Sequence, residues 1–356
     1  MTEALTYLYA IGKGAFEVDP RILGVDGQRP ARLVCDHGLT AVIGAGQANA
    51  LGASSREAIL RSLLAHQRVI ESLMGQGELL PVQFGTVVQD ETEVNGLLSQ
   101  GRTTILQALS AVQRKLEFET AITWSVPSVL QAIGAEPAVV QARTAIELRG
   151  TVSQDEAVSL GSIVKARLDE RRKAIQQKAL EQLCPVALQS TAHPLRDDSM
   201  VMNTAFLIED NNADDFQARI SGLDALFHGE LTLRVIGPLP PYSFFTLEVE
   251  KVSREDFASA AGLLGLSGEA FSQAEVKRAY RLMAIEAQRS LSKGGAEDDG
   301  REVGRLRRAA ELLEFCCDET GRVTLPDNSR WRLRIRASAG DDTPADSFGA
   351  EVIRGG

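Results

Sequence analysis

Residues that could carry out catalysis or bind a metal are few in this chain and widely spaced. The four cysteines and four histidines lack the paired spacing, about two to four residues, of a structural zinc site. There is no G-x-S-x-G elbow, H-E-x-x-H helix or Walker loop. The paired carboxylates are most simply solvated caps in loops or near helix starts: Asp197-Asp198, Asp214-Asp215 and Asp298-Asp299. The sequence therefore predicts a protein that is not an enzyme, with no catalytic, cofactor-binding or metal-binding residues.

One glycine-containing loop superficially resembles a dinucleotide-binding loop. The stretch Gly44-Ala45-Gly46-Gln47-Ala48-Asn49 follows an expected strand. The dinucleotide fingerprint needs a third small residue and a helix that begins at once, so that helix N–H groups meet the pyrophosphate. Here the sixth position is Asn49, and the helix is expected only near Ser55. We interpret the stretch as an ordinary strand-to-helix loop.

The most distinctive segment is rich in proline and aromatic residues. It reads Gly237-Pro238-Leu239-Pro240-Pro241-Tyr242-Ser243-Phe244-Phe245. Three prolines fix φ and remove three backbone donors, so the segment cannot be a central strand. We expect a stiff extended corner that places three aromatic rings at defined positions. The rings either dock into their own domain or form an apolar contact surface for a partner.

Length and composition limit the class of protein. The chain has 356 residues, 38 Lys+Arg and 48 Asp+Glu, for a net charge of −10. This length predicts two or three domains, and the acidic balance argues against a general nucleic-acid partner. No apolar run reaches the roughly 18 residues of a membrane span, and the first residues do not resemble a signal peptide. We expect no membrane partner, and reduced cysteines in a cytoplasmic protein.

The first third of the chain predicts an α+β domain. Strands are expected at 7–12, at 32–46 with a turn at Asp36-His37-Gly38, at 80–88 and at 117–124. Helices are expected after the caps at Ser54-Ser55 and at Asp90, the second with apolar spacing from Leu98 to Leu116. The order β-β-α-β-α-β over residues 1–126 resembles a ferredoxin-like variant.

A second small α+β domain is predicted for residues 153–254. Residues 127–152 contain helix-breaking prolines and are expected to link or edge the first domain. A long helix capped by Ser153 runs to about Leu183, with a basic side that is a solvated face or a docking patch for an acidic partner. Strands at 186–193 and 200–209, a helix at 214–227, and strands at 230–236 and 246–252 complete the unit.

Several of these segments together resemble the GvpF/GvpL family of gas vesicle accessory proteins. The resemblance covers roughly residues 5–252 and depends on GPLPPYSFF, on Asn203-x-Ala205-Phe206-Leu207 and on Leu80–Thr86 with His66 upstream. The opening YLYAIG and Arg171-Arg172 fit as well. It implies two α+β domains, a cytoplasmic non-catalytic role at the gas vesicle, and contact with the hydrophobic shell protein GvpA and other accessory proteins. The residues we expect to contact partners are Pro81, Phe84, Asn203, Phe206, Pro240, Pro241, Tyr242 and Phe244.

The remaining residues form an addition to that family pattern. Residues 255–320 resemble a J-domain, with a capped helix EVKRAYRLMAIEAQ and a second helix from about Arg301 to Cys316. A working J-domain needs His-Pro-Asp after the first of these helices, whereas this chain has Gln288-Arg289-Ser290. In residues 321–336, alternating arginines predict a terminal strand whose charged face is solvated or binds a partner. Residues 337–356 are expected to be a flexible tail.

Three functions remain open at this point. The first is a gas vesicle assembly factor that holds or delivers the shell protein. The second is a co-chaperone whose J-like segment recruits a chaperone, which the missing His-Pro-Asp argues against. The third is a ligand-binding regulator or enzyme on ferredoxin-like domains, which would show a deep polar pocket with converging ionisable groups.

Overall fold

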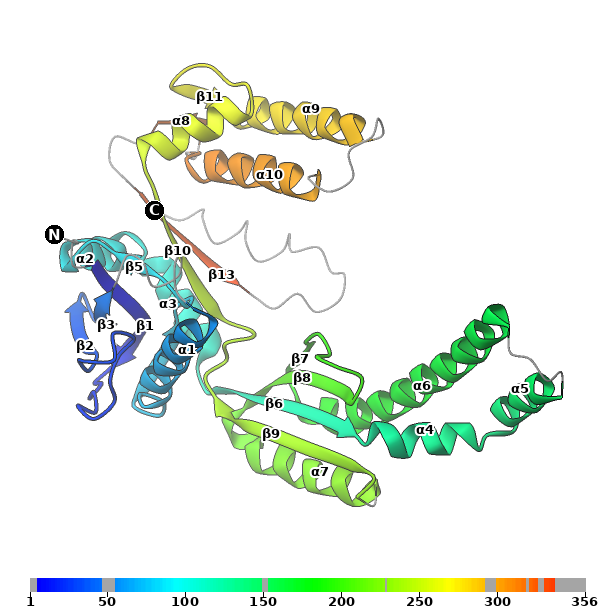
Figure 1. The fold of residues 1–356 in the computed structure, drawn as a ribbon. Helices are drawn as coiled ribbons and strands as arrows, with labels where there is room; N and C mark the ends of the chain where they lie inside the picture. The colour runs from blue at the N-terminus through cyan, green and yellow to red at the C-terminus, as the bar shows by residue number, and fades with distance from the viewer. Residues whose placement is uncertain are drawn as a thin grey trace.

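A five-stranded sheet and a four-stranded sheet, each with its own helices, and a third, largely helical unit make up the described part of the protein (Figure 1). The computed structural model describes residues 5–46, 55–148, 153–227, 229–291, 299–317, 320–325 and 330–336. In this part of the chain, no helix combines the length and hydropathy needed to cross a bilayer. The α+β class predicted from the sequence is confirmed. The predicted flexible tail at 337–356 lies outside the described residues.

The first sheet has ferredoxin-like strand order. Its strands are β1 (Leu5–Gly14), β2 (Arg32–Asp36), β3 (Leu39–Gly46) and β4 (Gly77–Pro81). The spatial order is β2-β3-β1-β4 with all neighbours antiparallel. A connection over residues 15–30 replaces the first crossover helix, and α1 (Arg56–Glu71) is the second. The side chain of Ser55 caps α1 by accepting from the Ala58 N–H, whereas Ser54 lies outside the described residues.

Both faces of this sheet are covered, which explains the nearly continuous apolar run in β1. Tyr7 and Tyr9 pack on the α1 side, with Ile70. Leu8 and Ile11 pack on the opposite side, against α2 (Glu91–Gln100) and α3 (Arg102–Val112). The single helix predicted from Asp90 onwards is therefore two helices, and Gly101 separates them.

Two predictions for the first unit need correction. The strand predicted at 80–88 is divided into β4 and the two-residue β5 (Val87–Val88), which turns back to pair with β1. The turn between them includes Gly85, whose φ of 90° is left-handed. The strand predicted at 117–124 does form, as β6 (Lys115–Trp124), but it pairs with β8 and β9 of the second sheet. The predicted boundary at residue 126 is therefore wrong, because strand periodicity identifies a strand but not its partner.

The second sheet repeats the same strand order. Its strands are β6, β7 (Gln189–Ala192), β8 (Met200–Glu209) and β9 (Leu231–Leu239), in the antiparallel order β7-β8-β6-β9. Two short 3-10 turns, η1 (Cys184–Val186) and η2 (Asp210–Asn212), precede β7 and α7 (Ala213–Leu226). One face packs on α7 and on the end of α6 (Gln154–Leu183), with Phe118 and Phe216 ring centroids 5.1 Å apart.

The stretch predicted as a linker or edge is helical. It contains α4 (Val126–Gly134) and α5 (Pro137–Glu147), which pack along α6 and form an arm that projects from the sheet (Figure 1). Pro137 occupies the first helical turn, where its missing N–H costs no hydrogen bond. The prolines that suggested a linker thus mark helix starts.

The third unit is inserted into a β-hairpin. β10 (Thr246–Val252) pairs with β13 (Arg330–Arg336), with Val252 opposite Arg330. Between them lie α8 (Arg254–Leu263), β11 (Ala270–Ser272), α9 (Gln273–Leu291), α10 (Asp299–Phe315) and β12 (Arg322–Thr324). These elements share a core that includes Phe257, Val276 and Leu313.

The predicted terminal strand is β13, and its two faces have different partners. Trp331, Leu333 and Ile335 pack against the first core, on the side of α2 and α3. On the other face, Arg332 is only 8% exposed and its guanidinium lies 3.4 Å from Glu311 of α10. The arginine face is therefore paired within the chain at Arg332, rather than wholly solvated.

Candidate functional site

The proline-rich corner begins in the last three residues of the edge strand β9, Gly237–Leu239, and its turn is held by backbone hydrogen bonds. The Gly237–Pro238 peptide bond is cis, and the Phe245 N–H donates to the Pro241 carbonyl at 2.8 Å. At Gly237, φ is 150°, and a Cβ there would lie 2.8 Å from the carbonyl oxygen of Glu117. Glycine is needed at this position because the irregular pairing of β9 with β6 brings the Gly237 backbone close to Glu117 and Phe118.

The three aromatic rings of the corner enter three separate apolar clusters. Tyr242 packs with the first unit on the α1 side, where Phe84 also lies. Phe244, 1% exposed, packs on the second sheet against Ala205 and Leu207. Phe245 contacts that cluster and also the α2–α3 side of the first core. The corner is therefore a joint that fastens the two sheets together.

A buried carboxylate lies under this joint. Glu117 of β6 accepts hydrogen bonds from the Ser243 N–H and the Ser243 Oγ–H, each at 2.7 Å. Burial raises the pKa of Glu117 from 4.5 to about 7, although both hydrogen bonds act to lower it. His193 Nε2 lies 3.4 Å from the same Ser243 hydroxyl. In a Ser–His–acid triad the acid orients the histidine, whereas here it binds the serine, so the arrangement does not build a nucleophile.

A second buried polar group lies in the first unit. The Tyr7 hydroxyl is 3.1 Å from His66 Nδ1 and accepts a hydrogen bond from the Gly85 N–H at 2.9 Å. Burial lowers the pKa of His66 to about 4, and the Phe84 ring meets the imidazole edge-on. The neutral His66 packs against the rings of Tyr9 and Phe84. It contacts the Tyr7 hydroxyl, which in turn holds the turn at Gly85.

The structure places most of the predicted partner-binding residues inside the protein. Five of the eight are buried: Pro81, Phe206, Pro240, Pro241 and Phe244. A direct contact by these five is not possible in this conformation, because their side chains already pack inside the chain. The other three, Phe84, Asn203 and Tyr242, are half-buried. Phe84 and Tyr242 lie in one cluster, whereas the Asn203 side chain donates to the Pro194 carbonyl at 3.1 Å.

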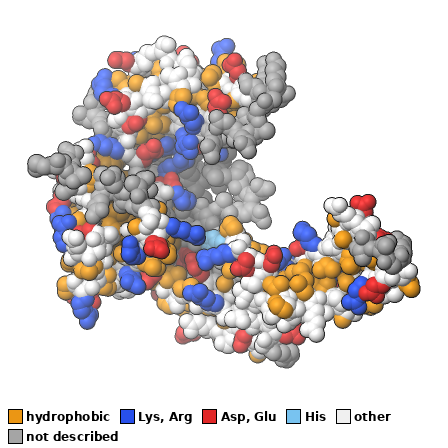
Figure 2. Space-filling model, viewed as in Figure 1, with side chains coloured by type: hydrophobic (Ala, Val, Ile, Leu, Met, Phe, Trp, Pro, Cys, Tyr) orange, Lys and Arg blue, Asp and Glu red, His pale blue; other side chains and the backbone are white. Residues whose placement is uncertain are grey.

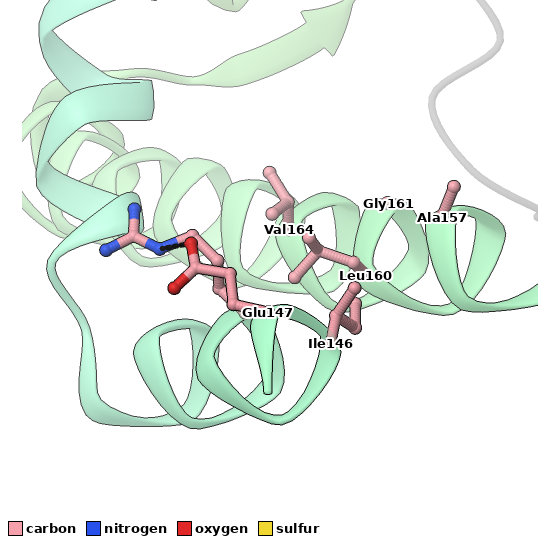
Figure 3. A pocket seen from close by; sticks show the side chains of 7 residues that line it. Ile146, Glu147, Ala157, Leu160, Gly161 and Val164 are labelled. Carbon is pink, nitrogen blue, oxygen red and sulfur yellow. Dashed lines mark ion pairs between the residues drawn. The ribbon is translucent and has the colours of Figure 1, made fainter. Parts of the chain in front are cut away.

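An open, mostly apolar cavity lies elsewhere, on the arm. It is a groove of about 490 Å³ between α5 and α6, lined by Arg143, Ile146, Glu147, Ala157, Leu160, Gly161 and Val164. Leu160 and Ile146 face one another across the two helices (Figure 3). Apolar side chains spread over this arm in the space-filling view (Figure 2). Exposed apolar patches of this kind mark interaction sites more often than chance surface.

The residues of this groove have no distinctive pattern in the sequence. Leu160 and Val164 appear in the sequence as part of the apolar face of a long helix, the usual signal of a core-facing helix. In the structure, only Ala179 and Leu183 of α6 are fully buried, because the sheet covers only the end of the helix. The apolar face of α6 is visible in the sequence. The sequence does not show that no other element packs over Leu160 and Val164 among the described residues.

The comparisons with known proteins agree with this architecture. The sequence model described as "Gas vesicle synthesis protein GvpL/GvpF" matches residues 5–246. The chain belongs to the GvpL/GvpF family. A role in gas vesicle formation follows from this membership, as the sequence motifs predicted.

Named relatives and solved structures show how far the likeness extends. The chain is 30% identical to gas vesicle protein F of a Streptomyces species over 251 residues, which cover 67% of this chain and 98% of that protein. It covers only 49% of gas vesicle protein F1 of Halobacterium salinarum, at 30% identity over 105 residues. The crystal structure of GvpF from Anabaena matches with a TM-score of 0.57 at 25% identity, covering 67% of this chain and 97% of that one.

A second GvpF crystal structure, from Microcystis aeruginosa, matches with a TM-score of 0.53 at 25% identity and covers 98% of that chain. The family match ends at residue 246, at the start of β10. The helical unit from α8 to α10 therefore lies beyond the matched region, and its likeness to a J-domain stays a prediction.

Proposed function

We propose that this GvpL/GvpF-family protein is a non-enzymatic accessory factor that acts in the cytoplasm by binding the shell protein GvpA and other gas vesicle accessory proteins. The observation that carries the proposal is the pairing of the family match with an exposed apolar groove on the arm. A hydrophobic shell subunit aggregates in water unless another surface covers it. An acidic protein with net charge −10 stays soluble while it presents such a surface.

The polar clusters of the described residues support binding rather than catalysis. The hydrogen bonds between Ser243 and Glu117 hold the proline-rich corner on the second sheet. His66 contacts the Tyr7 hydroxyl, which accepts a hydrogen bond from the Gly85 N–H and holds that turn. The groove on the arm is apolar and carries one ion pair, between Arg143 and Glu147. An apolar groove of this size suits a helix or a group of aliphatic side chains.

Direct contact through Phe84, Asn203 and Tyr242 remains part of the proposal. These three side chains keep some exposed surface next to the joint. The five buried residues of the predicted set would act indirectly, because they hold the joint in shape. A variant of a buried residue that loses binding must therefore be checked for folding before any contact is inferred.

Neither the arm groove nor the inserted helical unit gives specific support to the two rival functions. α9 continues to Leu291, so Gln288–Ser290 lie within the helix, at the place where a J-domain would have His-Pro-Asp. A chaperone partner therefore stays a prediction, which stimulation of an Hsp70 ATPase would support. The regulator or enzyme would need a polar pocket with converging ionisable groups, whereas the groove on the arm is apolar.

Two measurements test the proposed function. Deleting the gene from a host that forms gas vesicles is expected to abolish or greatly reduce the vesicles seen by electron microscopy, and the restored gene is expected to recover them. The purified chain is expected to bind GvpA fused to a soluble carrier, and not the carrier alone. Normal vesicles without the gene would refute the role, and no binding to the GvpA fusion would refute the partner.

A further inference from the structure

The polar attachment of the proline-rich corner to the second sheet depends on Ser243. The Ser243 N–H and Oγ–H both donate to the Glu117 carboxylate at 2.7 Å, and the hydroxyl lies 3.4 Å from His193 Nε2. Among the described residues, the other hydrogen bonds of residues 240–245 join the corner to itself or to the adjoining Thr246. Apart from Ser243, apolar packing therefore holds the corner on the sheet.

The carboxylate that receives Ser243 is buried without a counter-ion. Glu117 is 0% exposed, and the residues opposite it on the neighbouring strands are Leu207 and Leu239. Among the described residues, no lysine, arginine or histidine forms an ion pair with Glu117, and the nearby charge that acts on it, Glu119, has the same sign. Ionised Glu117 keeps its two hydrogen bonds but gains no cation, so burial favours the protonated form.

The other charged groups around the corner do not compensate for this burial. Lys115 of β6 donates to the Ala111 carbonyl and lies 5.5 Å from the centroid of the Phe245 ring. The Tyr242 hydroxyl is buried and has no described hydrogen-bond partner. Burial and the charges of Glu71, at the end of α1, and of Glu117 raise its pKa. Two carboxyl groups, one from each unit, thus act on the same unpaired hydroxyl.

The proton on Glu117 also decides what the Ser243 hydroxyl can bind. A protonated carboxyl can donate to the Ser243 oxygen, which leaves the Ser243 hydroxyl free to donate to a neutral His193. An ionised carboxylate only accepts, so it takes the Ser243 hydroxyl for itself. Protonation therefore links β6, the corner and the residue after β7 by one chain of hydrogen bonds, whereas ionisation leaves a buried charge beneath the corner.

We propose that the proline-rich corner is a strap that lifts from the second sheet when Glu117 loses its proton and closes again when the proton is bound. Lifting uncovers Phe244 together with Ala205 and Leu207, against which it packs. Pro240–Pro241, predicted from the sequence to contact a partner and buried in the closed form, become accessible in the lifted form. Proton release thus exposes apolar surface that the closed form covers.

The pKa of Glu117 sets the size of the effect. It is about 7 in the closed form against an ordinary 4.5, so the closed form binds more protons between these values. The equilibrium constant for lifting therefore rises about tenfold between about pH 6 and pH 8, and levels off above about pH 8, where both forms are ionised. Burial of Phe244 opposes lifting at every pH, so the lifted form is a minor state.

Hydrogen exchange of the Ser243 N–H in the full chain, followed by NMR, measures this minor state. After correction for the intrinsic exchange rate, we expect the protection of this amide to fall about tenfold from about pH 6 to pH 8. Low concentrations of urea separate lifting from unfolding. Exchange at Ser243 is expected to be insensitive to urea, because lifting exposes far less surface than unfolding, whereas exchange at Phe206, in the interior strand β8, is expected to accelerate.

Three variants identify the group that binds the proton. Glu117→Gln keeps an acceptor for the Ser243 N–H but does not titrate, so its protection at Ser243 is expected to change by less than about twofold over the same pH range. Glu119→Gln is the matched control on the same strand and is expected to keep the tenfold change. His193→Gln removes the other titrating group beside Ser243 and is expected to keep it as well.

Each contrary outcome overturns a stated part of the proposal. Equal protection of Ser243 at the two pH values in the parent chain means that no proton controls the strap. Exchange at Ser243 that follows urea as Phe206 does means that unfolding, not lifting, exposes it. A tenfold change that survives in Glu117→Gln, or disappears in His193→Gln, assigns the proton to another group. If Glu117→Gln does not fold, the parent chain and the other two variants still give these outcomes.

Discussion

The buried carboxylate of Glu117 predicts a specific pH dependence of stability for the second unit. The pKa of Glu117 is about 7 in the folded chain, against an ordinary value of 4.5. This difference of about 2.5 in pKa corresponds to roughly 3 kcal/mol in the free energy of unfolding. The raised pKa means that the folded state binds more protons than the unfolded state between these two values. Stability from this group is therefore full below about pH 4.5 and is lost as the pH rises to about 7.

Glu117→Gln removes this titration and keeps an oxygen that can accept from the Ser243 N–H. In the parent chain, we expect the Glu117 titration to lower the free energy of unfolding by roughly 3 kcal/mol between pH 4.5 and 8. In the Glu117→Gln variant, this decrease is expected to be absent. Urea unfolding followed by tryptophan fluorescence measures it. In a Trp331→Phe background, Trp124 at the end of β6 is the remaining tryptophan and reports on the second sheet.

The control is Glu119→Gln on the same strand, two residues further on and half-exposed. Other groups, His66 among them, titrate equally in parent and variant, so they cancel when the two stability curves are subtracted. The reasoning is refuted if the Glu117→Gln and parent curves stay parallel from pH 4.5 to 8, or if Glu119→Gln changes the slope by as much.

Three further predictions concern the joint, the buried histidine and the inserted unit. Phe244→Ala is expected to destabilise the chain by about 3 to 5 kcal/mol in urea unfolding, because it empties a fully packed site; a change below 1 kcal/mol would contradict the burial. His66 is expected to stay neutral from pH 8 to 5, because burial lowers its pKa to about 4, and NMR titration of its ring would show a charged form near pH 6 if this is wrong. Replacing the chain between Val252 and Arg330 by a short turn is expected to leave both sheets folded, because these two residues pair directly; loss of the circular dichroism of the sheets would contradict this.

The local features of the fold could be predicted because their causes are local. Ser55, Asp90 and Ser153 each accept a hydrogen bond from the free N–H of the first helical turn, and those caps mark the starts of α1, α2 and α6. The alternating residues of β13 likewise predict a strand, because successive side chains point to opposite faces.

The partner of each element could not be predicted in the same way. Glu117–Trp124 has the pattern of a strand, yet the pattern fits the end of the first sheet as well as the centre of the second. The corner was located from its prolines, but Tyr242 and Phe244 face inwards because two sheets meet over them, a contact between distant parts of the chain. The groove exists because no other element covers Leu160 among the described residues. The spacing of apolar residues along a helix does not show whether another element covers them.

The position of β13 has a consequence for the order in which the chain is made. The aliphatic and aromatic side chains of β13 close the first core over α2 and α3, yet they are among the last residues described. The roughly 220 residues between Val112 and Trp331 take about 10 to 45 s to synthesise at about 5 to 20 residues per second. Until β13 has been made, the contacts of Trp331, Leu333 and Ile335 with the first core cannot form, so the amino-terminal unit completes its packing only after the second sheet has been synthesised.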